Sequence, residues 1–295
     1  MIEKFQGIFP AVATAYDEND NVDSQIQADL SRWLIEQGCK GLFVCGGTGE
    51  SVLLSTEERK TVIEATMDAV GGEATVIAHI GSQSPKEAYE LAEHAAGLDV
   101  DAIAAIPGTY FLPDETELLK HYRRLGEIAQ RPVFLYHIPT TTHLDMSIEQ
   151  FRKLAEIPRV SGMKYTDTDL FKMQQVRADL GEDFAILAGS DQLMAPALLM
   201  GATGAVGTGY NYMFSIYTEA FEAAAAGDYQ RAAEYQRAGN DIIRTQLGYS
   251  SIDLCKLALR EMGFAVGPAR APLAEAPPEV RERFLDKLRE HNILT

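Results

Sequence analysis

The chain has 295 residues, and 46% of them are apolar, which is enough to bury a large core in one or two domains. Its 43 acidic and 26 basic residues give a formal net charge of −17, which opposes binding to nucleic acid or to an anionic membrane. No apolar run reaches the ~18 residues needed to span a bilayer, and three cysteines without a CxxC pair indicate no disulfide framework, so we expect a cytoplasmic protein.

Eight short apolar runs rich in β-forming residues recur along the chain. They occupy residues 7–16, 41–46, 75–80, 101–107, 132–139, 160–166, 184–191 and 204–210. The segments between them, such as 24–37 and 55–70, have apolar residues at three- and four-residue spacing, which is typical of amphipathic helices. Ser55 with Glu58 forms a capping-box pattern, and Ser84 precedes a proline at a first helical position. Strand and helix alternating eight times predicts a (β/α)8 TIM barrel.

The strand pattern stops after about residue 212. Residues 217–244 and 252–262 have helical periodicity, a proline-rich connection covers 267–278, and a last helix ends near His291. We therefore expect residues 1–212 to supply the barrel strands and most of the helices. Residues 213–295 should form the last barrel helix and a C-terminal helical extension.

A glycine-rich turn follows the second predicted strand, with the sequence GGTGES at residues 46–51. In a barrel of this type the active site forms at the carboxyl ends of the strands, and glycines there let backbone N–H groups approach an anion. Taken alone, this turn is explained equally well by the steric needs of a strand-to-helix connection.

Lys164 interrupts the apolar sixth strand, whereas the other nine lysines fall in helices, loops or strand starts, where we expect them to be solvated. Burial of an ammonium group is costly unless the group is paired or neutralised, and the same desolvation lowers the pKa of a buried lysine and favours the nucleophilic amine. The structural alternative is a lysine paired with a carboxylate such as Asp191.

Tyr136 lies at the corresponding place on the fifth strand. Period-two alternation puts Lys164 and Thr166 on one face of the sixth strand and Tyr136 on one face of the fifth. Neighbouring strands lie ~4.8 Å apart, so the phenol reaches Lys164 if both side chains point inward. A phenol there is placed to move a proton to and from a substrate oxygen. Viewed alone, Tyr136 also fits a core tyrosine with a satisfied hydroxyl.

The combined motifs resemble those of the N-acetylneuraminate lyase and dihydrodipicolinate synthase superfamily, over nearly the whole chain. They are GGTGES at 46–51, YHIP at 136–139, MKYTDTD at 163–169, GSD at 189–191 and GATGAVGTGYNY at 201–212. The resemblance implies that Lys164 forms a Schiff base with pyruvate and that Tyr136 transfers protons. It implies further that Thr48, with the backbone of Gly47, binds the pyruvate carboxylate. It implies no metal or organic cofactor, and a homo-oligomer, either a dimer or a tetramer.

Within this superfamily the chain looks closest to the sialic acid lyases. In that branch Asp191 and Gln192 would hold the hydroxyl-bearing tail of a sugar acid, with Thr166, Gly189 and Thr208 lining the same cleft. The lyases usually carry glutamate at the place of Gln192 and serine or threonine at that of Gly47, although an amide still binds hydroxyls.

Three alternatives remain beside the lyase. Dihydrodipicolinate synthases usually carry threonine and an arginine clamp at the places of Gly47 and Thr141, which disfavours that reading. An aldolase or dehydratase of 2-keto-3-deoxy sugar acids also fits, because the GGTGE turn occurs there too. A barrel that only binds a keto acid needs neither Lys164 nor Tyr136. The expected partner is therefore a small molecule, pyruvate with a sugar-derived aldehyde.

Four further residues lie near the predicted site, and the sequence suggests a role or an environment for each. By resemblance, Tyr110 comes from a neighbouring subunit or caps the pocket. His79 and His137, with Asp191, are conceivable ligands of a metal-dependent aldolase, but they lack HxH or HExxH spacing, and we predict no catalytic metal. Cys45 has no basic neighbour in sequence and is expected to be an inert core thiol.

Overall fold

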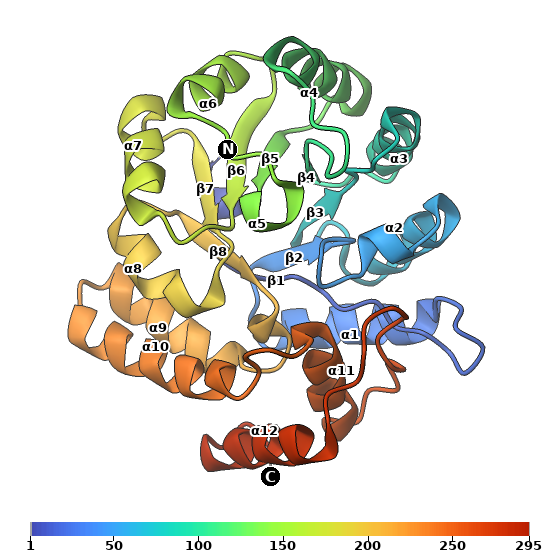
Figure 1. Ribbon diagram of the computed structural model, residues 1–295, viewed down its shortest axis with the longest axis vertical. Coiled ribbons are helices and arrows are strands. Elements are labelled where there is room, and N and C mark those ends of the chain that lie inside the picture. Colours follow the sequence, from blue (N-terminus) through green and yellow to red (C-terminus); the bar gives the residue numbers. More distant parts are fainter. Residues whose placement is uncertain (1, 295) are drawn as a thin grey trace.

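The computed structural model describes residues 2–294, and its centre is a barrel of eight parallel strands (Figure 1). Hydrogen-bonded neighbours follow the order β1-β8-β7-β6-β5-β4-β3-β2. The remaining gap is closed by a parallel bridge between Ala11 and Phe43, where the Val12 N–H donates to the Phe43 carbonyl at 3.0 Å. The predicted TIM barrel is thereby confirmed. The strands are β1 (Gly7–Pro10), β2 (Gly41–Val44), β3 (Thr75–His79), β4 (Ala102–Ala105), β5 (Val133–His137), β6 (Val160–Tyr165), β7 (Ala185–Ala188) and β8 (Gly204–Gly207).

Helices surround the barrel and alternate with its strands (Figure 1). Ser55 caps α2 with the complete capping box that its sequence predicts, and Pro85 occupies the first turn of α3 as expected. The barrel helices are α1 (Ser24–Glu36), α2 (Thr56–Val70), α3 (Pro85–Gly97), α4 (Glu115–Ala129), α5 (Pro139–Thr142), α6 (Ile148–Ala155), α7 (Leu170–Leu180), α8 (Met194–Leu199) and α9 (Phe214–Ala225).

The barrel interior is filled by aromatic and aliphatic side chains, which make it a packed core. Phe9, Phe43 and Phe134 are fully buried there. The short 3-10 helix η1 (Ile2–Phe5) adds Phe5, whose ring packs edge-on against Phe134 at 4.8 Å. Because η1 precedes β1, Phe5 fills the amino end of the barrel, and the polar groups of the site lie at the carboxyl end.

The C-terminal part differs from the prediction in one respect. Periodicity indicated a single helix over 217–244, but the chain forms α9 and then α10 (Tyr229–Arg244), which pack against each other. Gly227 adopts a positive φ of 78° and Asp228 caps α10 by accepting the Arg231 N–H at 3.1 Å. The break therefore has a local cause, a glycine followed by an N-cap residue.

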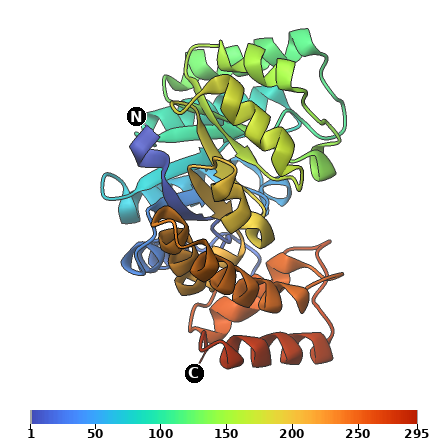
Figure 2. The same ribbon diagram turned by 90° about the vertical axis from the view of Figure 1, so that its left-hand side faces the viewer.

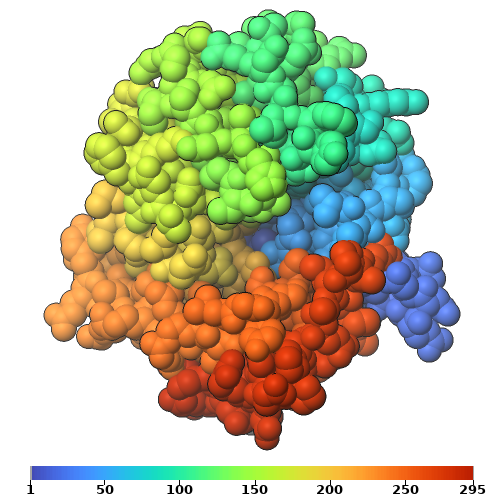
Figure 3. Space-filling view, in the orientation of Figure 1, coloured from blue at the N-terminus to red at the C-terminus, as the bar shows by residue number. Residues whose placement is uncertain are grey.

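The extension continues with α11 (Ser251–Glu261) and α12 (Pro278–Glu290), and these helices lie together at one end of the molecule (Figure 2). The space-filling view shows a hollow near the middle of one face, bordered by barrel loops and by the orange and red extension (Figure 3). Within residues 2–294, no helix has both the length and the apolar character required to cross a bilayer.

Candidate active site

Lys164 and Tyr136 lie side by side on neighbouring strands. The β5–β6 register pairs the two residues directly, and the Lys164 Nζ donates a hydrogen bond to the Tyr136 Oη at 3.0 Å. Lys164 is 4% exposed, and its Nζ lies 4.6 Å from the centroid of the Phe43 ring and 4.3 Å from that of Tyr136. The adjacency that strand alternation predicts is thereby confirmed.

No carboxylate neutralises this amine. Among the ion pairs formed within residues 2–294, none includes Lys164. Asp191, the partner in the structural alternative, instead accepts the Gly209 N–H at 2.7 Å. An uncompensated amine beside a phenol, among aromatic rings, is suited to attack a carbonyl carbon while the phenol moves protons at the neighbouring oxygen.

The glycine-rich turn after β2 borders the same pair of side chains. Gly47 is exposed, and a Cβ built on it would lie 3.9 Å from the Tyr136 Oη. The next residue, Thr48, is buried, and its hydroxyl lies 2.7 Å from that of Thr208, which follows β8. The structure thus brings the predicted residues Gly47, Thr48 and Thr208 to the carboxyl end of the barrel beside Tyr136.

A pocket of about 210 Å³ contains the remaining predicted residues of the sugar-binding set. Thr166, Gly189, Asp191, Gln192 and Thr208 all line it. Sequence reasoning missed Tyr212, the last residue of the predicted barrel part, and three lining residues from the C-terminal part, namely Ile243, Gln246 and Ser251. Their role depends on where the extension docks, and no local pattern in the sequence carries that information.

Two glycines allow the polar side chains of this pocket to approach the backbone. A Cβ on Gly189 would lie 1.9 Å from the Thr166 Oγ1, and one on Gly207 would lie 1.9 Å from the Asp191 Oδ1. The Thr166 hydroxyl is buried and has no hydrogen-bond partner within the described chain. It is therefore available to a hydroxyl of a bound molecule.

Asp191 contributes a carboxyl group to the lining of the pocket. Burial raises the pKa of its carboxyl group to about 6, while the Gly209 N–H and the positive charge of Lys164 act in the opposite direction. Asp191 therefore titrates close to neutral pH, which is common for groups at functional sites.

A second buried lysine corrects the expectation that the other nine are solvated. The Lys256 Nζ lies 2.6 Å from the Glu50 Oε1, and both side chains are fully buried. Glu50 belongs to the glycine-rich turn, has a positive φ of 56°, and also accepts the Arg270 N–H at 2.7 Å. Burial lowers the pKa of Lys256, and the Glu50 charge opposes this effect. The sequence signal was a lysine within the apolar stretch 254–259 of α11.

Tyr110 lies outside this pocket in the single chain. It follows β4 and is 81% exposed, with its ring packed edge-on against the equally exposed Phe111 at 4.9 Å. Its expected contribution from a neighbouring subunit, or as a cap on the pocket, stays a prediction.

The two histidines do not form one ligand set with Asp191. The His79 Nδ1 bonds to the Cys45 carbonyl at 2.8 Å, and its ring packs edge-on against Tyr136. His137 faces the other side of β5, where it stacks on Tyr165. Among residues 2–294, the His137 ring lies close to the Asp145 and Asp167 carboxylates, and the three together could hold a metal ion. Cys45 is fully buried, and burial raises the pKa of its thiol to about 11, as expected of an inert thiol.

Comparison with known proteins agrees with this architecture. A sequence profile of the dihydrodipicolinate synthetase family matches residues 4–291. An N-acetylneuraminate lyase of Clostridium perfringens is 35% identical over 280 residues, which are 94% of this chain and 96% of that protein. A structure described as a catalytic lysine mutant of Ruminococcus gnavus sialic acid aldolase superposes with a TM-score of 0.95 at 29% identity, covering 99% and 98% of the two chains.

A dihydrodipicolinate synthase from Aquifex aeolicus superposes nearly as well, with a TM-score of 0.93 at 28% identity, covering 98% of this chain and 99% of that one. Both branches of the family therefore share this fold. The chain belongs to the dihydrodipicolinate synthetase family and is one of its class I pyruvate aldolases, lyases that work through a Schiff base.

Proposed function

We propose that the chain cleaves N-acetylneuraminate to pyruvate and N-acetylmannosamine, or a closely related sugar acid to pyruvate and the corresponding sugar aldehyde. The observation that carries this proposal is the polar pocket at the carboxyl end of the barrel. Its lining offers the Thr166 and Thr208 hydroxyls, the Asp191 carboxylate and the Gln192 amide, which are the groups that bind sugar hydroxyls.

In the cleavage direction, the Lys164 amine attacks the C2 ketone of the open-chain acid, and loss of water gives a protonated imine. Tyr136 takes the proton from the C4 hydroxyl while the C3–C4 bond breaks. The electron pair of that bond enters the imine, which becomes an enamine, and the C4 carbon leaves as an aldehyde. Protonation of the enamine and hydrolysis then release pyruvate and restore the amine.

The Gly47–Thr48 turn holds the substrate carboxylate in this scheme. Backbone N–H groups of a glycine-rich turn bind a carboxylate without a charged side chain, and this contact fixes C2 near the Lys164 Nζ before bond formation. The position of Gly47 next to the Tyr136 hydroxyl supports this assignment.

The relatives support the same choice among substrates. The Clostridium perfringens relative is a N-acetylneuraminate lyase, and the Ruminococcus gnavus structure is described as a sialic acid aldolase with a catalytic lysine. Against the synthase branch, the exposed Thr141 of α5 supplies no guanidinium group for a second carboxylate.

A second candidate is an aldolase or dehydratase of 2-keto-3-deoxy sugar acids. Gly47, which has no side chain, fits the GGTGE turn found in that group as well.

The test is to incubate the protein with N-acetylneuraminate, with 2-keto-3-deoxygluconate, and with pyruvate plus aspartate semialdehyde, and to assay pyruvate release and condensation product. The proposal predicts pyruvate release from N-acetylneuraminate. Substitution Gln192→Ala should weaken its apparent affinity roughly ten- to a hundredfold, or ~1–3 kcal/mol, because a substrate hydroxyl loses its hydrogen-bond partner.

Gln175→Ala, at an exposed position of α7, is the matched control and should change nothing. Turnover confined to the six-carbon acid or to the condensation would contradict the lyase assignment and leave the Schiff-base chemistry intact.

A further inference from the structure

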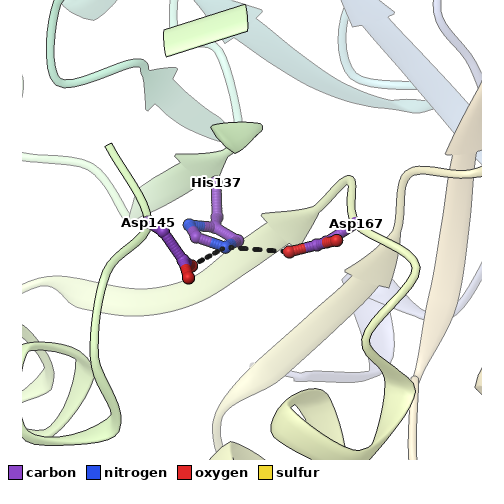
Figure 4. A group of neighbouring side chains, drawn as sticks. All are labelled: His137, Asp145 and Asp167. Atoms are coloured by element: carbon purple, nitrogen blue, oxygen red, sulfur yellow. Dashed lines mark ion pairs between the residues drawn. The ribbon is translucent and has the colours of Figure 1, made fainter. Parts of the chain in front are cut away.

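Behind the Lys164–Tyr136 pair, three potential metal ligands meet on the outer side of the barrel (Figure 4). His137 is the last residue of β5, Asp145 lies in the loop before α6, and Asp167 follows β6. The His137 Nε2 lies 3.5 Å from the Asp145 Oδ1 and 3.7 Å from the Asp167 Oδ2. Because successive residues of a strand face opposite sides, this cluster lies on the other side of β5 from Tyr136.

The imidazole of His137 makes no hydrogen bond within the described part of the chain, although its Nε2 lies within ion-pair distance of two carboxylates. Its side chain is completely buried, and neither ring nitrogen makes a hydrogen bond. The separations of 3.5 and 3.7 Å are too long for such bonds, yet Nε2 faces both carboxylates (Figure 4). A buried imidazole that makes no hydrogen bond, with two carboxylates beside it, is suited to a bound cation.

The same distances suit a bound cation. With metal–ligand bonds of about 2.1 Å, two ligands of a tetrahedral ion lie about 3.4 Å apart. The ligand atoms of the three residues all lie within 4.8 Å of one another. One neutral imidazole with two carboxylates is a donor set of Zn²⁺ and its first-row neighbours, whereas Mg²⁺ and Ca²⁺ prefer oxygen ligands alone.

Lys172 is an internal competitor for this cluster. Its ammonium group, on the first turn of α7, forms an ion pair with Asp145 and is 14% exposed. The Asp145 side chain is 65% exposed, so the lysine has a path to solvent when another cation enters. The Lys172 ammonium group neutralises the Asp145 carboxylate, but the ring nitrogens of His137 still make no hydrogen bond within the described residues.

We propose that His137, Asp145 and Asp167 bind one divalent first-row transition metal ion of the Zn²⁺ type, in exchange for the Lys172 ammonium group. The ion ties the end of β5 to the loops before α6 and after β6. Water completes its coordination on the open side next to Asp145. This site takes no part in bond cleavage at Lys164, so a test of metal binding is independent of a test of the proposed function.

Titration of the metal-free, full-length protein with Co²⁺ at pH 7 tests the proposal, because cobalt reports its ligands through visible absorption. We expect one Co²⁺ per chain, displaced by Zn²⁺, and a rise in the thermal midpoint as the ion binds the folded state. Asp145→Asn and Asp167→Asn should each weaken binding at least about tenfold. Lys172→Met should strengthen it, since it removes the competing cation.

Asp183→Asn is the matched control, an exposed carboxylate in the turn before β7, at the amino end of the barrel. It should leave Co²⁺ binding unchanged. Absence of Co²⁺ binding in both the wild type and Lys172→Met would overturn the proposal, as would binding that Asp145→Asn and Asp167→Asn leave intact. Asp145 is exposed, so its variant tests the site even if changes at the buried His137 prevent folding.

Discussion

At the scale of single residues, the hydrogen bond between Lys164 and Tyr136 gives the phenol two tasks. In the proposed mechanism, it orients the amine toward the substrate ketone and exchanges protons with the substrate oxygen. The edge-on ring of His79 and the ring of Phe43 hold the phenol in place from two sides. Substitution of Tyr136 by phenylalanine therefore removes the hydroxyl and leaves these ring contacts in place.

Tyr136→Phe should therefore lower turnover ~10²–10⁴-fold, while affinity for pyruvate changes far less, because the ring still fills its space without the proton shuttle. Steady-state kinetics together with pyruvate binding measures the two effects separately. Tyr229→Phe, at a residue 56% exposed on α10, is the control. Near wild-type turnover in Tyr136→Phe would assign Tyr136 a structural role only.

The raised pKa of Asp191 predicts that the affinity for the sugar acid depends on pH. Because burial raises the pKa of its carboxyl group to about 6, the group gains a proton as the pH falls through that value and loses an acceptor for substrate hydroxyls. Apparent affinity for the sugar acid should decrease below about pH 6, and Asp191→Asn should remove this inflection. The same raised pKa means that the charged form costs folding free energy, so stability contributed by this group is lost as the pH rises through about 6.

A KM profile from pH 5 to 8 for wild type and Asp191→Asn gives the result directly. An inflection that persists unchanged in the variant would assign the titration to another group.

Much of the site could be predicted at this scale, because strand alternation and strand order determine that Lys164 meets Tyr136. The placements of Gln246 and Lys256 could not. Both lie in the extension, and their burial depends on how helices docked from distant sequence cover the barrel, which no local periodicity encodes.

At the scale of elements, the glycine-rich turn after β2 is held from the far end of the chain. Glu50 pairs with Lys256 of α11, and the Lys256 Nζ also donates to the Pro268 carbonyl at 2.9 Å. Its charge lies 3.9 Å from the centroid of the Tyr16 ring. Because Glu50 lies in the same turn as Gly47 and Thr48, this buried pair connects the extension to the proposed carboxylate site.

Lys256→Met should destabilise the protein by about 3–5 kcal/mol, since it leaves the Glu50 carboxylate buried without a counter-charge. Urea unfolding measures the loss, and the double variant Glu50→Gln with Lys256→Met should recover part of it. Lys120→Met, which removes an exposed pair with Glu117 on α4, should cost far less, because solvent screens the two charges. Equal losses of unfolding free energy in the two single lysine variants would show that the buried pair contributes no more to stability than the exposed pair.

The elements also show where periodicity misleads. The apolar spacing continues from α9 into α10 because both helices bury one face, so the turn between them is visible only through Gly227 and Asp228. Similarly, the first apolar run covers 7–16, but only Gly7–Pro10 form a strand. The residues after it are equally buried and belong to a loop, and burial alone does not distinguish the two.

At the scale of the whole molecule, the barrel supplies the chemistry and the extension completes the pocket. Lys164 and Tyr136 come from strands, whereas Gln246 and Ser251 reach the pocket from the C-terminal helical region. The division of the chain into 1–212 and 213–295 is therefore not a division of function. In the proposed mechanism, every step of the reaction depends on an imine at Lys164.

Borohydride reduction in the presence of pyruvate, followed by peptide mass spectrometry, tests that claim most directly. Only an imine is reduced to a stable secondary amine, so the pyruvate-derived mass should appear on the peptide that contains Lys164. The peptide that contains Lys256 is an internal control, because this lysine is also buried but is paired with Glu50. A label on Lys256 or any other lysine, or no label at all, would contradict the Schiff-base role of Lys164.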